Sequence, residues 1–150
     1  MNESIAQRSA ALFDAGFYCA ESVLLAVAEA RNVGCKLIPQ IATGFCSGVA
    51  RSCGMCGAVS GAILAIGLAM GRTSADESVD NVYKAVGSVL DGFEAEFGSF
   101  NCQSLLSCDL GTEDGQRFFH ERKLYATCRT YVARATALAL DVIEECQRSG

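Results

Sequence analysis

Several features that mark common kinds of enzyme are missing from this sequence. It has one histidine, His120 in the segment FFHERK, around which no Ser-His-Asp triad can be assembled. No GxxxxGK phosphate loop occurs, and the glycines of GFCSGVARSCGMCGAVSG do not follow a strand, which disfavours a dinucleotide site. Basic runs are also missing and the net charge is −5, so we expect no nucleic-acid partner.

The sequence also lacks the marks of β-structure. It contains one proline and no stretch of strand-like alternation, whereas apolar residues recur at helical spacing between glycines. We expect longer helices at about residues 3–15, 18–32, 56–71, 75–97 and 113–148, and short ones near residues 39–47 and 101–107. The sequence therefore predicts an all-α fold, a compact bundle of about six helices around a buried, glycine-rich apolar helix at about residues 56–71. A chain of this length is expected to form a single domain, spanning residues 1–150.

The longest uncharged segment raises the question of a membrane span. From Arg51 to Arg72 there are 20 residues without a charge, about the length that crosses a bilayer. Five glycines and two cysteines interrupt it, and only residues 58–70 are densely apolar. We therefore interpret it as a buried core helix and expect no membrane insertion. The hydrophobic fraction of 51% and the mean hydropathy of +0.26 favour a homodimer that buries an apolar helix face.

Two local patterns add detail to the helices. The glycines of the apolar segment form two pairs one turn apart, Gly57 with Gly61 and Gly67 with Gly71. A bare glycine face lets a neighbouring backbone come close. Ser74 with Glu77 three residues later predicts a capping box at the start of the helix that follows.

What the sequence does have is cysteine, at nine positions. They are Cys19, Cys35, Cys46, Cys53, Cys56, Cys102, Cys108, Cys128 and Cys146. The number is odd, and a chain of this size does not need a disulfide framework. The N-terminal segment has no apolar core of an export signal, so we expect a reducing, cytoplasmic location. In that compartment many cysteines are typical of metal ligands or redox-active thiols.

Two arrangements of cysteines indicate where the site lies. Cys46, Cys53 and Cys56 form a C-x6-C-x2-C cluster, whose C-x-x-C part can clasp a metal ion or close into a disulfide. Four cysteines fall at predicted helix starts, namely Cys19, Cys56, Cys102 and, if the last helical region breaks near Thr127, Cys128. Free backbone N–H groups and the positive end of the helix dipole lower the pKa of a thiol there, and they equally suit an anionic iron–sulfur cluster.

The segments around these four cysteines resemble a known family. In chain order they read GFYCAESVLLA, RSCGMCGAVSGAILAIGLAMG, FEAEFGSFNCQSLLSCDL and CRTYVARA. Over about residues 8–143 they look like the C-GCAxxG-C-C family of redox-active proteins. The resemblance implies redox activity and a prosthetic group such as an iron–sulfur cluster. The family's four cysteines correspond to Cys19, Cys56, Cys102 and Cys128, and further cysteines outside this pattern include Cys46, Cys53 and Cys108.

Three functions remain open at this point. In the first, the four cysteines hold one iron–sulfur cluster and the protein transfers electrons to a redox partner protein or oxidoreductase. In the second, thiol pairs such as Cys53 and Cys56 cycle between thiol and disulfide without metal. In the third, the same thiolates hold zinc or another soft metal in a module that acts through a partner. The metal ligands expected from the sequence are Cys19, Cys53, Cys56, Cys102 and Cys128.

Overall fold

The chain folds into helices throughout. The computed structural model describes all 150 residues, with eight α-helices, one 3-10 helix and no β-strand. In chain order these are α1 (Asn2–Asp14), α2 (Cys19–Ala30), the 3-10 helix η1 (Gln40–Phe45), α3 (Cys46–Arg51), α4 (Gly57–Met70), α5 (Asp80–Phe97), α6 (Cys102–Leu106), α7 (Glu113–Glu121) and α8 (Tyr125–Ser149). The prediction of an all-α fold is confirmed. The α-helices number eight and not about six, because the last helical region is two helices and the irregular segment after residue 45 contains a helical turn.

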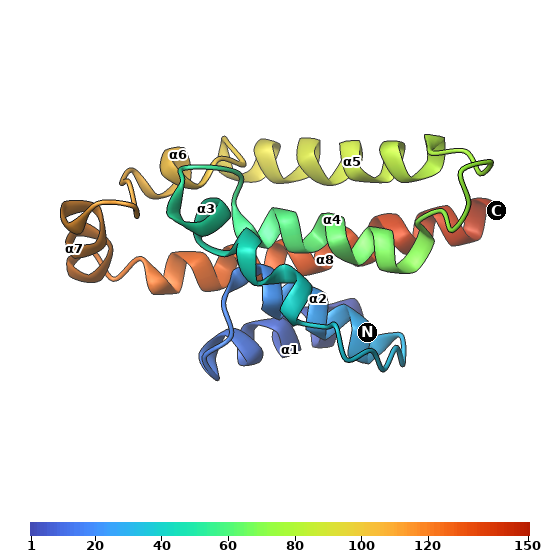
Figure 1. Cartoon of the computed structure of the whole chain (residues 1–150), viewed down its shortest axis with the longest axis horizontal. Coiled ribbons are helices and arrows are strands. Elements are labelled where there is room, and N and C mark those ends of the chain that lie inside the picture. The colour runs from blue at the N-terminus through green and yellow to red at the C-terminus, as the bar shows by residue number, and fades with distance from the viewer.

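Three helices run along the length of the molecule (Figure 1). In this view α5 lies above α4 and α8 passes behind α4, and α4 contacts both of them. The helices α1 and α2 pack against each other and against α8, and α2 also contacts α4. The short helices α3, α6 and α7 gather at the end of the molecule opposite the C-terminus. The first turns of α4 and α8 also face that end, where the candidate site lies.

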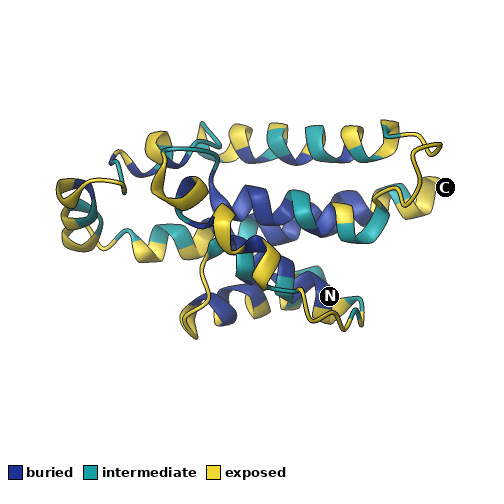
Figure 2. Cartoon of the chain, in the orientation of Figure 1, coloured by how far each residue is buried: buried dark blue, intermediate teal, exposed yellow.

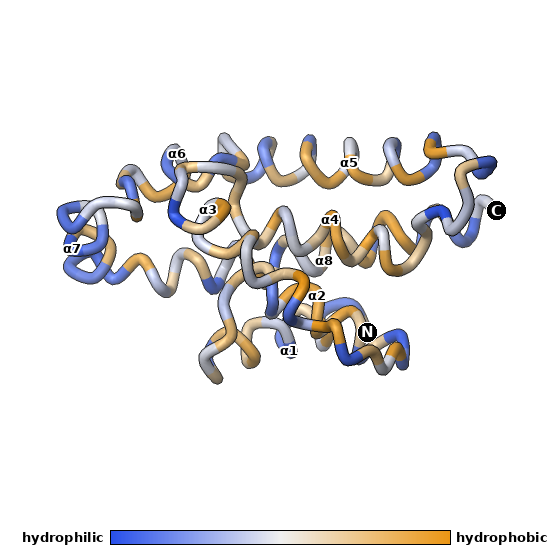
Figure 3. The backbone as a smooth tube through the Cα atoms, in the orientation of Figure 1, coloured by the Kyte–Doolittle hydropathy of each residue, from blue (hydrophilic) through white to orange (hydrophobic).

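The first half of α4 is the most deeply buried helical segment. Every residue from Gly57 to Ala62 is buried, whereas Gly67 is exposed and the turn after it is half-buried. Figure 2 shows this burial along α4, and Figure 3 shows apolar residues along much of the same helix. A Cβ atom on Gly61 would lie 2.8 Å from the carbonyl oxygen of Ala20, so α2 packs directly on the bare face of α4. The predicted close approach of a neighbouring backbone is therefore confirmed at Gly61. It is wrong at Gly67, where a Cβ atom would meet nothing within 4 Å.

The start of α5 differs from the prediction. The helix begins at Asp80, with Val79 as its N-cap, and not at residue 75. The expected capping box does not form, because one carboxylate oxygen of Glu77 accepts hydrogen bonds from the N–H (3.3 Å) and hydroxyl (3.0 Å) of Thr73. Residues 71–79 therefore form a loop between α4 and α5.

The last helical region is divided into two helices, as expected, but the break lies slightly before Thr127. The break falls at residues 122–124, where Lys123 has a φ of 54°, a left-handed conformation that ends a helix. The helix α8 then begins at Tyr125, so Cys128 is its fourth residue.

The structure has no helix that combines the length and the hydropathy needed to cross a membrane. The most apolar helix, α4, has 14 residues.

Candidate functional site

A cavity of about 230 Å³ lies where the starts of α2, α4 and α8 meet α3, α6 and α7. Four of the nine cysteines line it: Cys19, Cys56, Cys102 and Cys128. Each comes from a different helix start, and the walls between them are mainly apolar or aromatic, including Phe13, Leu105, Leu106, Phe119, Tyr125 and Tyr131. The structure thus brings together the four cysteines that match the family pattern.

A short antiparallel contact fixes two of these cysteines side by side. Met55 and Asn101 form an isolated β-bridge. On either side of it, the Cys56 N–H donates to Phe100 O (2.8 Å) and the Cys102 N–H donates to Gly54 O (2.9 Å). The Asn101 side chain donates to Cys53 O (2.8 Å) and accepts from the Ser104 N–H (3.0 Å), which caps α6. The backbone of the CGMC segment is therefore tied to the start of α6.

The segment α3 is a left-handed helical turn. Its residues from Ser47 to Ala50 have φ between 54° and 66°, and Arg51 continues the pattern at 66°. Residues other than glycine adopt this conformation at a cost of about 1–2 kcal/mol each. The turn is held by the Gly54 N–H, which donates to Gly48 O (2.8 Å). A Cβ atom on Gly48 would lie 2.5 Å from Cys102 Cβ, so the left-handed turn packs its one glycine directly on a cavity cysteine.

A fifth cysteine, Cys46, lies next to the cavity, close to Gly57 and to Cys19 at the start of α2. A Cβ atom on Gly57 would collide with Cys19 Sγ and would lie 3.2 Å from Cys46 Cα. Cys19 packs against the buried group of side chains that contains Cys46, and the Cys46 thiol donates a hydrogen bond to Ala42 O (3.7 Å). Cys46 is buried and does not line the cavity itself. Gly57, the first glycine of the CGAVSG motif, therefore leaves room for the Cys19 sulfur.

One wall of the cavity is made by α1 and α8. The rings of Phe13 and Tyr125 stack with centroids 4.5 Å apart, and the Tyr125 hydroxyl donates to Phe13 O (2.7 Å). Arg129 pairs with Asp14 at 3.0 Å beside them. Burial raises the pKa of Tyr131, and the nearby Cys128 raises it further. These contacts hold the first turn of α8, and with it Cys128, against α1.

Burial controls the protonation of the cavity thiols. It raises the pKa of Cys56 and of Cys102 to about 11, and that of Cys128 to about 12. The amides of Val59 and Ala58 at the start of α4 act in the opposite direction on Cys56, but the effect of burial is larger. The expectation that helix starts lower the thiol pKa is therefore wrong for Cys56 and Cys102. Burial thus keeps these two thiols protonated at neutral pH.

The remaining cysteines lie outside the cavity. Cys53, predicted as a metal ligand, is not among the lining residues; the nearby Asp109 carboxylate raises the pKa of Cys53. Cys108 is buried nearby, Cys35 is exposed and Cys146 is half-buried at the far end of α8. No three histidine, cysteine, aspartate or glutamate side chains lie close enough together to hold one metal ion.

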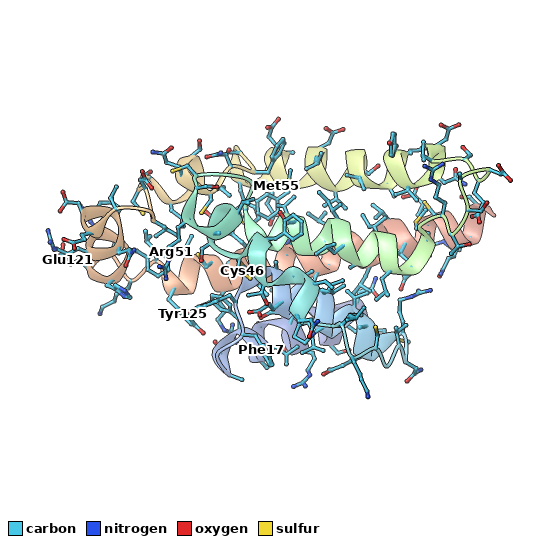
Figure 4. All side chains as sticks on the ribbon, viewed as in Figure 1. Phe17, Cys46, Arg51, Met55, Glu121 and Tyr125 are labelled. Atoms are coloured by element: carbon cyan, nitrogen blue, oxygen red, sulfur yellow. The ribbon has the colours of Figure 1, made fainter.

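Arg51 and His120 also line the cavity, and neither was predicted as a ligand from the sequence. Arg51 lines the cavity and makes no ion pair, and Figure 4 shows it between α3 and the start of α8. His120, to which the sequence assigned no specific role, also lines it from the end of α7. Nothing local in the sequence distinguishes Arg51, because its place at the cavity depends on the left-handed turn. The contact between Cys46 and Cys19 was missed for the same reason.

We expect the stability of the cofactor-free protein to fall as the pH rises from about 8 to about 11. Below about pH 8.5 the thiols of Cys56, Cys102 and Cys128 are protonated in both the folded and the unfolded chain, so their contribution is fully present. Above it the unfolded chain releases protons that the folded chain retains, and stability is lost until the pH passes the folded pKa values of about 11 to 12. Melting temperatures across this range would measure the slope.

The matched comparison uses Cys56→Ala and Cys35→Ala. Removing the buried Cys56 thiol should make the decline with pH shallower by about 2–3 kcal/mol over the range, since its pKa is raised by about two units and one unit corresponds to about 1.4 kcal/mol. Removing the exposed Cys35 thiol should leave the dependence of stability on pH as it is in the parent protein. Equal slopes in all three proteins would contradict the protonation scheme.

Comparison with known proteins gives one family match. A family profile described as "Putative redox-active protein (C_GCAxxG_C_C)" matches residues 17–142. No protein of curated function and no solved structure matches the chain. The matched range includes all four cysteines of the cavity and the CGAVSG motif at the start of α4. The chain belongs to the C_GCAxxG_C_C family.

Proposed function

We propose that this protein binds an iron–sulfur cluster through Cys19, Cys56, Cys102 and Cys128 and serves in electron transfer. The observation that carries the proposal is that these four cysteines, which are far apart in the sequence, border one cavity. Four cysteine thiolates are the usual protein ligands of such clusters. A cluster occupies a volume and takes its thiolates around its periphery, which fits four thiols that reach a cavity of about 230 Å³ from four helix starts.

The electrostatics of the cavity support the same proposal. Cys56, Cys102 and Cys128, with pKa values of about 11 to 12, are poor nucleophiles at neutral pH, because the thiolate is the reactive form. Positive iron at the site would favour the thiolates that burial disfavours. Loading must therefore release protons, and affinity for iron should rise with pH.

The chain's own residues prepare the cavity for a negatively charged group. The amides of Ala58 and Val59 favour a thiolate at Cys56. Arg51, which has no carboxylate partner, supplies a positive charge at the wall. The aromatic wall of Phe13 and Tyr125 limits access of water. A bound cluster would supply one-electron chemistry, and the partner would be a redox protein that approaches this end of the molecule.

The first test is an ultraviolet–visible spectrum, with iron and sulfide analysis, on protein purified without oxygen. We expect the broad visible absorption of thiolate-to-iron charge transfer, with iron and sulfide in matching amounts, and bleaching in air. An iron chelator should also lower the melting temperature, because the ligands join four segments of the fold.

Other outcomes of this test would replace the proposal. A colourless protein that contains stoichiometric zinc would make the site a soft-metal site. A colourless, metal-free protein with intact helical content would contradict the cluster and leave thiol chemistry as the function of the site.

A further inference from the structure

Cys19 and Cys46 lie beside each other, although only Cys19 lines the cavity. Cys46 belongs to α3 and Cys19 to the first turn of α2, yet Cys19 packs against the buried group of side chains that contains Cys46. Both residues also border Gly57: its Cβ position would collide with Cys19 Sγ and would lie 3.2 Å from Cys46 Cα.

A carboxylate holds the two segments together. One oxygen of Glu21 accepts a hydrogen bond from the Tyr18 N–H (2.9 Å), which caps α2. Its other oxygen accepts from the Thr43 hydroxyl (2.8 Å) in η1. Glu21 thus ties the residue before Cys19 to a residue three positions before Cys46. The pair is therefore part of a fixed junction, which Figure 4 shows near the label of Cys46.

We propose that Cys19 and Cys46 form a reversible disulfide when the cavity holds no cofactor and a small-molecule disulfide is present. The exposures of the two residues assign their roles. Cys19 lines the cavity, so a small disulfide can reach it. Cys46 is 4% exposed and can be reached only by its neighbour.

The reaction proceeds in two exchanges. The Cys19 thiolate attacks one sulfur of the small disulfide, forming a mixed disulfide and releasing the first small thiol. The Cys46 thiolate then attacks the Cys19 sulfur, forming the Cys19–Cys46 bond and releasing the second small thiol. Two electrons pass from the protein to the small disulfide, and the protons of the two protein thiols end on the two small thiols.

One consequence rests on the proposed function. If Cys19 is a cluster ligand, the disulfide withholds one of four thiols from the cavity. Oxidised protein should then fail to take up iron until a dithiol reductant opens the bond. The disulfide would make loading of the cofactor depend on the redox state of the compartment.

The test is to treat reduced, cofactor-free protein with oxidised glutathione, alkylate the free thiols and analyse peptides without reduction. We expect the number of free thiols at positions other than the exposed Cys35 to fall by two, with a peptide cross-linked through Cys19 and Cys46. In Cys46→Ser we expect one glutathione trapped on Cys19 and no cross-link. Cys108→Ser, which removes a buried thiol outside the cavity, should retain the cross-link.

Two results would overturn the disulfide. One is a cross-link from Cys19 to another cysteine. The other is a folded parent protein that takes up glutathione on Cys35 but keeps Cys19 and Cys46 reduced. If Cys46→Ser does not fold, Cys19→Ser provides a second check, because its buried Cys46 should stay free of glutathione. The cross-link needs no iron, so its failure is distinguishable from absence of the cluster, which the iron analysis reports separately.

Discussion

The substitution Gly61→Ala is expected to lower the free energy of unfolding by about 2–3 kcal/mol, toward the upper end for overpacking of a core. The added Cβ would lie 2.8 Å from the carbonyl oxygen of Ala20, 2.9 Å from Val23 Cβ and 3.0 Å from Ala20 Cα. Two of these three atoms are backbone, so the whole of α2 must move away from α4. Thermal unfolding followed by circular dichroism would show a fall in melting temperature of roughly 5–10 °C for a domain of this size.

The matched control is Gly67→Ala on the same helix. A Cβ at Gly67 would meet nothing within 4 Å, and the residue is exposed. Alanine in a helix interior is favoured over glycine by about 0.5–1 kcal/mol, so this variant should be as stable as the parent or slightly more so. The opposite ranking of the two variants would mean that α2 does not pack on the glycine face of α4.

The substitution Cys56→Ser is expected to remove the visible chromophore and to lower bound iron at least about tenfold. Loss of a hydrogen-bond partner of a ligand already costs about 10-fold to 100-fold in metal affinity, and loss of a ligand should cost more. Cys56 is also the N-cap of α4 and is buried among the cavity walls, so no other thiol can take its place without moving a helix. Iron analysis and the visible spectrum of protein purified without oxygen would measure the effect.

Cys108→Ser provides a control of similar burial. Cys108 is 9% exposed and Cys56 is 7% exposed, but Cys108 does not line the cavity. We expect its serine variant to retain the iron and the spectrum of the parent. Equal loss in the two variants would indicate a general effect of a buried hydroxyl, and loss in Cys108→Ser alone would overturn the assignment of ligands.

The position of the left-handed turn explains why so many site residues depend on one short segment. The turn places Gly48 on Cys102, Arg51 on the cavity wall and Cys46 beside Cys19. Backbone strain of this kind persists where surrounding contacts hold it, and it is concentrated at functional sites. The site therefore combines two regular helix starts, at Cys19 and Cys56, with a strained connection between them.

Much of the fold was determined by the sequence itself. Helical spacing of apolar residues and glycine stops depend on neighbours within a few positions, so the boundaries of α1, α2, α4 and α6 were predicted to within about two residues. The same local rules put Cys19, Cys56 and Cys102 at helix starts, and the close approach at Gly61 followed from its lack of a side chain. The predicted end of α5 at residue 97 is confirmed, but its predicted start was wrong because the Glu77 carboxylate has two competing donors in Thr73.

Only the tertiary structure decided the chemistry of the site. Whether a thiol at a helix start has a lowered or a raised pKa depends on the burial that other segments impose, and at Cys56 burial outweighs the helix amides. Sequence spacing favoured Cys53 over Cys46 as a ligand, but the structure places Cys46 beside the cavity cysteine Cys19 and Cys53 near Asp109, outside the cavity. A run of positive φ angles has no local pattern in this sequence, because packing against Cys102 and the hydrogen bond from the Gly54 N–H to Gly48 O stabilise it. Contacts of this kind join residues distant in the chain, and they arise only when the helices assemble.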